Sequence, residues 1–412
     1  MYLGTLYNIM KLFIIHAHTA NRGDEAAVKA MIDEILLRLP STDITISLNG
    51  LTSYPNMNEK IVQIGRVPKI RSIISRLEFL VFYFTNGKVC FSKEFKEFIE
   101  YIKAADMVIH APGGPSIGDI YIKDEVLYLL RLDLVRKLKK KYMFYAPSMG
   151  PFYKKKNKRL RKMVLQGAEL ILLRDPISVS YLKQFLPDIK VEQVLDSALQ
   201  HEVDEELNQN KLENYIELKN FLHAYDKCLG ITITDLRWHP FYKNTNIEAN
   251  IVDTFSKFID NRIKEGYGIL FIPQLYGTGN DKNLMNAFMK GQHTFMVVDS
   301  VDKYDAYFQQ YIISKLYAVI GMRYHSNIFS AKMGVPFVSI SYEQKMQGFM
   351  KMMGLDKYCI DVDSISLEKL EETFENLNVD YSNYRQNLYN LHDTMTKKSS
   401  RATECLINLL TK

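Results

Sequence analysis

The architecture of this chain is clearest in one stretch, Ile320-Gly321-Met322-Arg323-Tyr324-His325-Ser326-Asn327-Ile328-Phe329-Ser330-Ala331-Lys332-Met333-Gly334-Val335-Pro336. The apolar residues 317–320 predict a buried strand that ends at Gly321, and a helix follows that closes at Gly334. Residues 335–340 predict the next buried strand. Such a unit is typical of a parallel sheet, whose ligands bind outside the carboxyl ends of the strands, where helix N-termini favour anions. Arg323 and His325 fall at this place, which predicts a site for a small, multiply charged anion.

Two interpretations of these residues remain open. A single arginine or histidine at the end of a strand is more often a surface or capping residue than a functional one. Two cationic groups in one crevice would repel each other without an anion between them, which favours binding. Arg174 and Lys345 also follow predicted buried strands, although Arg174 could instead form a surface pair with Asp175.

The length of the chain, 412 residues, predicts two domains. Strands and helices alternate through residues 11–194 and again through residues 229–340, which predicts an α/β fold with two doubly wound parallel sheets facing a cleft. We expect Rossmann-like domains at residues 1–200 and 226–380, a polar linker region at residues 201–225, and a helical tail at residues 381–412.

Composition and charge limit the classes of function that this chain can have. The formal net charge of +6 is too small, without a recognised module, to indicate a nucleic-acid partner. The cysteines are scattered and show no metal-ligand spacing, so we expect reduced thiols and no bound metal. No apolar stretch approaches the ~20 residues that span a bilayer. With no secretion leader evident, the cytoplasm is the expected location.

Two glycine-containing turns follow predicted strands. In the first, Gly23 would let the backbone approach a ligand, and Asp24 could either cap the following helix or contact a ligand, with Asn21 beside them. In the second, Gly113 and Gly114 could bring backbone N–H groups to a sugar or a phosphate, although a plain loop is as good an interpretation.

Two segments suggest a surface role. Residues 154–162 are strongly basic, and residues 70–98 mix aromatic with basic side chains. A solvated face and an ordinary core helix are the simple interpretations. The functional interpretation is peripheral docking on an anionic membrane leaflet.

Taken together, the motifs resemble the polysaccharide pyruvyl transferase family. The segments that carry this resemblance are Asn21-Arg22-Gly23-Asp24-Glu25-Ala26, Gly113-Gly114 with Gly118-Asp119, Met149-Gly150-Pro151, Leu173-Arg174-Asp175 with Ser178, Asp196-Ser197-Ala198, Ile272-Pro273-Gln274, Gly321-Met322-Arg323-Tyr324-His325, Gly334-Val335-Pro336 and Tyr342-Glu343-Gln344-Lys345. The last three are the most specific. The resemblance implies a GT-B-like fold, phosphoenolpyruvate as donor with no further cofactor, and a glycan acceptor that receives pyruvate as a ketal.

Carried over by position, the resemblance implies that Arg174, Arg323 and His325 bind phosphoenolpyruvate, with the acceptor on the N-terminal side and the donor on the C-terminal side. As hypotheses, His325 and Arg323 act in catalysis with Asp24 as a hydroxyl base. The expected substrate-binding set is completed by Lys345, Asn21, Gly23, Gly113, Gly114 and Gln274. The acceptor could be a lipid-linked precursor of a capsule or exopolysaccharide. Rival hypotheses are a nucleotide-sugar glycosyltransferase of the same architecture and a non-catalytic anion- or glycan-binding protein.

Overall fold

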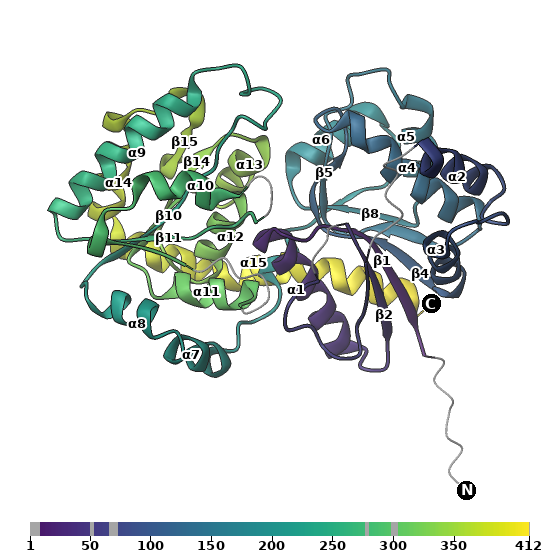
Figure 1. Ribbon diagram of the computed structural model, residues 1–412, viewed down its shortest axis with the longest axis horizontal. Coiled ribbons are helices and arrows are strands. Elements are labelled where there is room, and N and C mark those ends of the chain that lie inside the picture. Colours follow the sequence, from purple (N-terminus) through teal and green to yellow (C-terminus); the bar gives the residue numbers. More distant parts are fainter. Residues whose placement is uncertain (1–8, 50–52, 66–72, 277–279, 298–303, 412) are drawn as a thin grey trace, which may run out of the picture.

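The computed structural model describes residues 9–49, 53–65, 73–276, 280–297 and 304–411. Over these ranges the chain forms two lobes side by side, each a parallel sheet flanked by helices (Figure 1). The predicted fold class of two Rossmann-like domains is confirmed. The first residues of the segment 70–98 and the start of the chain lie outside the described ranges.

The described strands form two large sheets in which every neighbouring pair runs parallel. The N-terminal sheet has the order β3 (Val62–Gly65), β2 (Asp43–Leu48), β1 (Lys11–Ala17), β4 (Met107–His110), β6 (Tyr142–Phe144), β8 (Leu170–Leu173) and β9 (Glu192–Gln193). The C-terminal sheet has the order β12 (Thr294–Met296), β11 (Gly268–Phe271), β10 (Cys228–Thr232), β13 (Ala318–Gly321), β14 (Phe337–Ser341) and β15 (Cys359–Asp361). The strand order reverses between β1 and β4 and between β10 and β13, and such switch points are where doubly wound sheets bind ligands.

Helices cover both sheets. Those of the N-terminal lobe are α1 (Arg22–Arg38), α2 (Ile73–Phe84), α3 (Lys93–Ala104), α4 (Ile122–Lys137), α5 (Lys158–Gln166) and α6 (Pro176–Phe185). The segment between the sheets contains η1 (Ser197–Leu199), α7 (Glu205–Glu213) and α8 (Ile216–His223). Those of the C-terminal lobe are α9 (Ile247–Lys264), α10 (Asp281–Met285), η2 (Asn286–Phe288), η3 (Gly291–His293), α11 (Ala306–Ser314), α12 (Tyr324–Lys332), α13 (Gln344–Met352), η4 (Asp356–Tyr358), η5 (Val362–Ser364) and α14 (Leu367–Val379). The segment expected to be a linker is therefore largely helical.

The final helix, α15 (Tyr381–Leu410), runs across both lobes (Figure 1). Its first half buries Tyr384 and Leu388 in the core of the C-terminal lobe, and its second half buries Ala402 and Leu406 in the core of the N-terminal lobe. The expected tail is thus part of both cores. Within the described ranges, no helix is long and apolar enough to cross a membrane.

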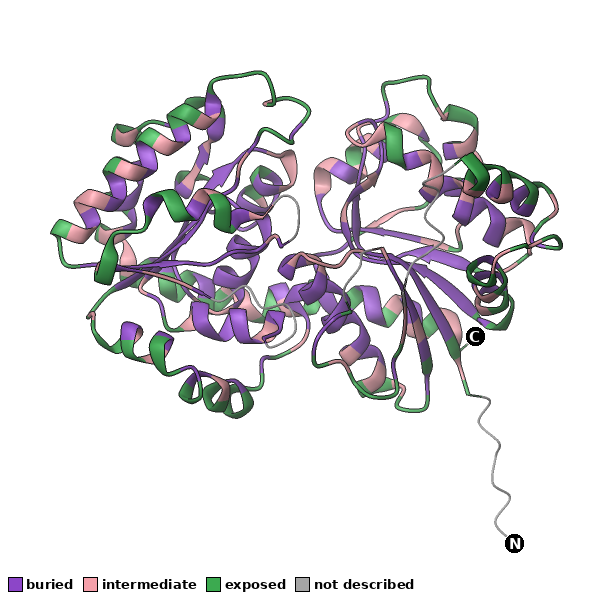
Figure 2. Ribbon diagram, viewed as in Figure 1, coloured by how far each residue is buried: buried purple, intermediate pink, exposed green. Residues whose placement is uncertain are grey.

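The strands are buried and the outer helices carry the exposed residues (Figure 2). Because helices cover both faces, several central strands are continuous apolar runs, as in β8, Leu-Ile-Leu-Leu. A short break, in which Ala146 adopts a φ of 52°, separates β6 from β7 (Pro147–Met149). One local prediction needs correction. The glycine-rich turn contains a short strand, β5 (Gly113–Ile117), which pairs in parallel with β7.

Candidate active site

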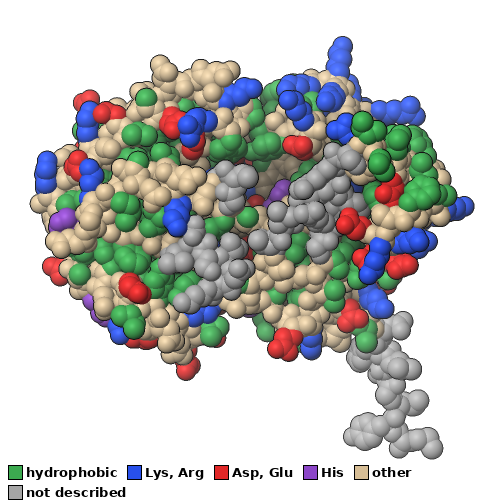
Figure 3. Space-filling view, viewed as in Figure 1, with side chains coloured by type: hydrophobic (Ala, Val, Ile, Leu, Met, Phe, Trp, Pro, Cys, Tyr) green, Lys and Arg blue, Asp and Glu red, His purple; other side chains and the backbone are tan. Residues whose placement is uncertain are grey.

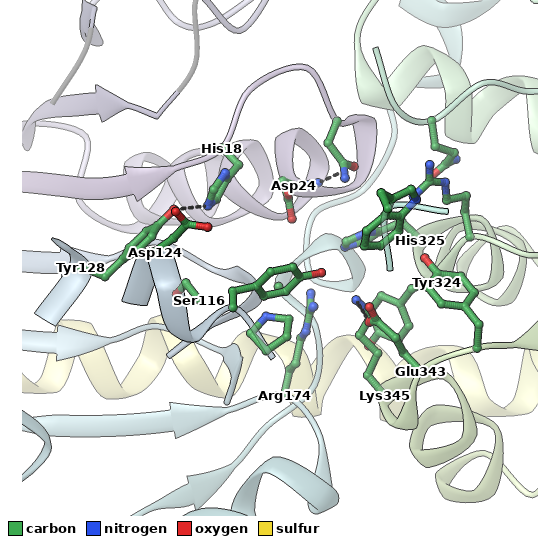
Figure 4. Close-up of a pocket in the computed structure, with 18 residues that line it drawn as sticks. His18, Asp24, Ser116, Asp124, Tyr128, Arg174, Tyr324, His325, Glu343 and Lys345 are labelled. Carbon is green, nitrogen blue, oxygen red and sulfur yellow. Dashed lines mark hydrogen bonds and ion pairs between the residues drawn. The ribbon is translucent and has the colours of Figure 1, made fainter. Parts of the chain in front are cut away.

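A cavity of about 290 Å³ lies between the lobes, beside the carboxyl ends of the central strands. Figure 3 shows the molecule hollowed between the lobes, and Figure 4 shows the side chains that line the cavity. The predicted site residues among its lining are Asn21, Asp24, Gly114, Arg174, Gln274, Arg323, His325 and Lys345. Side chains far apart in sequence therefore meet at one place. Their individual roles stay predictions.

Four helices begin at this cavity, because residues at the N-termini of α1, α4, α12 and α13 all line it. Helix N-termini carry partial positive charge and favour anions. The cap of α1 is Asn21, whose side chain accepts hydrogen bonds from the backbone N–H of Gly23 at 2.8 Å and of Asp24 at 3.4 Å. The interpretation of Asp24 as the cap is therefore wrong, and its carboxylate lies at the cavity instead (Figure 4).

Arg174 follows β8 and is buried. Its Nη1 donates to Asp196 Oδ2 at 2.5 Å, and its Nε donates to Ser148 Oγ at 3.0 Å. Burial would raise the pKa of Asp196, but Arg174, His325 and the backbone N–H of Ala198 together favour the carboxylate and hold that pKa well below its usual range. The alternative of a surface pair with Asp175 is wrong, because Asp175 caps α6 and accepts from the backbone N–H of Ser178 at 2.7 Å.

His325, in the first turn of α12, faces the same carboxylate from the opposite lobe. Its Nε2 lies 3.5 Å from Asp196 Oδ2, too long for a strong hydrogen bond. Across the described ranges this buried nitrogen makes no hydrogen bond within the usual distance. Asp196 therefore lies between Arg174 of the N-terminal lobe and His325 of the C-terminal lobe.

Arg323 is held by Asp281 at the start of α10, which accepts bonds from both Nε, at 3.1 Å, and Nη2. Burial would lower the pKa of Arg323, but Asp281 and Tyr342 together more than offset burial and raise it. Lys345 likewise pairs with Glu343 at 2.5 Å. The repulsion expected between Arg323 and His325 is offset within the protein, because Arg323 pairs with Asp281 and Nε2 of His325 lies 3.5 Å from Asp196 Oδ2.

Two predicted glycines make room for other site residues. A Cβ at Gly23 would lie 1.8 Å from Nδ1 of His325, so the imidazole packs directly on the backbone of α1. A Cβ at Gly113, whose φ is 152°, would lie 3.2 Å from Oδ1 of Asp24. In this structure Gly23 and Gly113 therefore position His325 and Asp24, which differs from the direct ligand contact predicted for them.

Gln274 joins the lobes as well as lining the cavity. Its carbonyl accepts from the backbone N–H of Arg22 at 2.9 Å, and its side-chain Nε2 donates to Gln309 Oε1 at 2.7 Å. Its backbone N–H donates to Asp281 Oδ2 at 3.1 Å. Gln274 therefore helps to hold the lobes together, and the substrate contact predicted for it stays a prediction.

Much of the cavity wall consists of residues that were not predicted as site residues. Its other lining residues are His18, Pro115, Ser116, Tyr121, Asp124, Tyr128, Trp238, Tyr324, Tyr342 and Glu343. One signal was available, since Tyr121, Asp124 and Tyr128 are spaced by three and four residues and so share one face of α4. His18 lies just beyond β1, as other site residues lie just beyond their strands.

Two polar pairs support the N-terminal wall. Tyr128 Oη lies 3.0 Å from His18 Nε2, and Ser116 Oγ lies 3.0 Å from His110 Nε2. Burial lowers the pKa of His110 to about 4, so the imidazole is neutral near pH 7. Its Nδ1 lies 2.9 Å from the carbonyl of Ala111, which can only accept, so Nε2 is the atom that accepts from Ser116.

The profile of the polysaccharide pyruvyl transferase family matches residues 21–344, more than half of the chain. The chain belongs to the polysaccharide pyruvyl transferase family. As a member it is a transferase. Among curated proteins it is similar to the amylovoran biosynthesis protein AmsJ of Erwinia amylovora, with 26% identity over 388 residues, covering 86% of this chain and 89% of AmsJ.

Comparison with solved structures places the chain in the GT-B fold. It is similar to Staphylococcus aureus MnaA in a co-structure with UDP (TM-score 0.59, 11% identity, 98% of this chain and 96% of that chain). It is also similar to the UDP-GlcNAc 2-epimerase of Neisseria meningitidis bound to UDP-GlcNAc (TM-score 0.56, 12% identity, 97% and 100%). A further match is a transferase of Siraitia grosvenorii in complex with UDP (TM-score 0.56, 10% identity, 98% and 100%). At these identities the likeness concerns the fold alone.

Proposed function

We propose that the chain transfers pyruvate from phosphoenolpyruvate to a sugar of an exopolysaccharide or capsule, or of its lipid-linked precursor, forming a ketal and releasing phosphate. Family membership supports pyruvyl transfer, and the role of AmsJ in amylovoran biosynthesis supports a polysaccharide acceptor. We expect the reaction to take place on the cytoplasmic side of the membrane. We expect it to need no further cofactor. The observation that carries the proposal is the convergence of Arg174, Arg323 and His325 on one interlobe cavity.

The donor fits the arginine side of the cavity. Phosphoenolpyruvate carries a carboxylate and a phosphate, and guanidinium groups bind both in bidentate fashion. A guanidinium has five N–H donors. The bonds of Arg174 to Asp196 and Ser148 engage two of them, so it could hold an oxyanion while keeping its partners. The N-termini of α12 and α13 would add favourable dipoles.

The reaction requires two proton transfers. Two acceptor hydroxyl oxygens form bonds to the central carbon of the enol, while its bond to the phosphate oxygen breaks. One hydroxyl proton ends on the methylene carbon, which becomes the methyl group, and the other leaves with the phosphate. In this scheme His325 delivers a proton or stabilises the leaving phosphate, and Asp24 accepts a proton from the attacking hydroxyl.

The acceptor fits the opposite wall. His18, Ser116 and Asp124 come from the N-terminal lobe, and Figure 4 places them across the cavity from Tyr324, His325 and Lys345. Hydroxyl, imidazole and carboxylate groups are suited to hydrogen bonds with sugar hydroxyls. The proposal therefore assigns the donor to the C-terminal wall together with Arg174, and the acceptor to the N-terminal wall.

The test combines ligand binding with turnover. Titration of the purified chain with phosphoenolpyruvate should saturate, whereas titration with UDP or GDP should not. Incubation with phosphoenolpyruvate and a panel of lipid-linked and soluble oligosaccharides should release phosphate and add one pyruvyl mass to an acceptor. Saturation by UDP or GDP alone would instead assign a nucleotide-sugar glycosyltransferase, and phosphoenolpyruvate binding without turnover of any acceptor would assign a binding protein.

A further inference from the structure

Helix α2, on the outside of the N-terminal lobe, exposes an unusual number of large hydrophobic side chains. Its inner face buries Phe79, Phe82 and Tyr83. The α2 apolar face consists of the exposed hydrophobic residues of this helix and of the segment after it: Ile73 (76% exposed), Ile74 (78%), Leu77 (59%), Leu80 (45%), Val81 (38%), Phe84 (73%), Val89 (40%) and Phe91 (71%). A helix that is hydrophobic all round is normally covered on all sides, and a contiguous exposed patch marks an interaction site.

A dense group of cations lies on the same lobe. The α5 basic face consists of the exposed residues Lys154, Lys155, Lys156, Lys158, Arg159 and Lys162. Residues 153–162 contain no acidic residue, and Tyr153 among them is 72% exposed. Arg161 does not belong to this face, because it is buried and pairs with Glu125 and Asp119. Figure 3 shows hydrophobic and basic side chains together on the upper part of the N-terminal lobe.

Helix α4 holds both faces in place. Near its C-terminal end, Asp133 accepts a hydrogen bond from Tyr83 of α2, and Lys137 Nζ lies 3.5 Å from the centre of the Tyr83 ring. Near its N-terminal end, Glu125 accepts from Nε of Arg161 of α5 at 2.7 Å. A helix of 16 residues is ~24 Å long, so the two faces are anchored within about that span.

We propose that the α2 apolar face and the α5 basic face together dock the chain on an anionic phospholipid bilayer. Exposed large hydrophobic side chains insert at the boundary between headgroups and acyl chains, and neighbouring lysines and arginines pair with anionic headgroups. A bilayer complements both faces at once. A second copy of the chain does not, because two α5 basic faces brought together would repel each other.

Docking in this way has a consequence for the substrate. The first turn of α4 lines the cavity through Tyr121 and Asp124, while the rest of the helix carries the two docking faces. The bilayer surface would therefore lie within about one helix length of the cavity, where an acceptor sugar on a lipid carrier could enter. This consequence rests on the proposed function, whereas the docking itself does not.

The experiment is flotation of the full chain with vesicles of phosphatidylcholine alone and with added phosphatidylglycerol. The wild-type chain should float with the anionic vesicles and release as salt rises. The double variants Ile74→Glu/Phe84→Glu and Lys155→Glu/Lys158→Glu should each float at least about tenfold less. Matched controls are Val379→Glu, a hydrophobic side chain 79% exposed on α14, and Lys397→Glu on α15. Both should float like the wild type.

Failure of the wild type to float with any vesicle, or equal flotation of the α2 variant, would overturn the proposal. So would a stable dimer in size-exclusion chromatography that Ile74→Glu/Phe84→Glu converts to monomer, because a second copy would then cover α2.

Turnover separates this test from the proposed function. The α2 variant should match the wild type on a soluble acceptor and lose rate on an acceptor embedded in vesicles. Flotation without turnover of any acceptor would support docking and contradict pyruvyl transfer.

Discussion

The C-terminal wall of the cavity holds its charges in ion pairs, one buried and one partly buried, whereas the N-terminal wall presents more open polar groups. Arg323 is bonded to Asp281 and Lys345 to Glu343, with little access to solvent. Across the cavity, Asp24 is half-buried and Asp124 is exposed. Removing one member of a buried pair leaves an uncompensated charge, which costs far more than losing an exposed polar contact.

This difference suggests that the walls serve different ligands. Buried pairs fix the direction of a guanidinium, which suits a small rigid anion that must be held in one orientation. An open wall of carboxylate, hydroxyl and imidazole groups suits a larger sugar with several hydroxyls. Arg174 is part of the N-terminal lobe, but it lies on the side of the cavity assigned to the donor. It is connected to His325 of the C-terminal lobe through Asp196.

The largest expected effect comes from the donor wall. Arg323→Ala and His325→Ala should each lower kcat/KM by about three orders of magnitude, since they remove charge stabilisation or proton transfer in the transition state. Steady-state phosphate release measures this. Arg401→Ala, which removes an arginine from a surface pair with Glu192, is the matched control and should keep full activity. Wild-type turnover in both Arg323 and His325 variants would remove them from the site.

The next effect concerns positioning. Gly23→Ala should lower kcat by about a hundredfold, because the new methyl group would displace the His325 ring. A catalytic side chain that is displaced from its reacting position loses much of its rate enhancement. Gly348→Ala is the control, because a Cβ there would meet its nearest neighbour at an ordinary 3.6 Å. Thermal unfolding of both variants separates loss of geometry from loss of fold. If Gly23→Ala keeps wild-type kcat, then His325 does not depend on this close packing.

A smaller and more selective effect is expected on the N-terminal wall. Asp124→Asn and Tyr128→Phe should raise KM for the acceptor about tenfold, the size of one or two lost hydrogen bonds, with KM for phosphoenolpyruvate unchanged. Varying each substrate at saturating levels of the other measures both constants. A rise in KM for phosphoenolpyruvate alone would reverse the assignment of the two walls.

The smallest effect concerns stability at low pH. Burial would raise the pKa of Glu343, but Lys345 and His239 together more than offset burial and lower it from its ordinary 4.5 to about 2. A lowered carboxyl pKa contributes stability that is present above the unfolded-state value and is lost as pH falls toward the folded-state value. From about pH 5 to about pH 3, the free energy of unfolding should therefore fall less in Glu343→Gln than in the wild type.

Urea unfolding at several pH values measures this difference. The control is Glu404→Gln, which changes a carboxylate on α15 that is 45% exposed. It should follow the wild-type curve. A Glu343→Gln curve parallel to that of the wild type would show that the pair with Lys345 does not contribute to acid stability.

Strands and helices were predictable where local pattern and burial agree. The stretch around Arg323 folds as β13, α12 and β14, as its apolar runs and Gly334 predict. Side-chain contacts were harder to predict where the two partners of an ion pair lie far apart in the sequence. Asp196 entered only as part of a quoted motif and Asp281 not at all, although each holds an arginine of the site. Nothing in the local sequence tells which carboxylate will face which arginine after folding.

The amino-acid sequence by itself determined the two parallel sheets and the set of side chains at their carboxyl ends, because apolar periodicity and the ends of strands are local properties. Only the tertiary structure decided that Gly23 makes room for His325, that each cation has an acidic partner, and that α4 lies between the cavity and the exposed α2. These facts depend on contacts between residues that are distant in the chain, and a sequence pattern does not contain them.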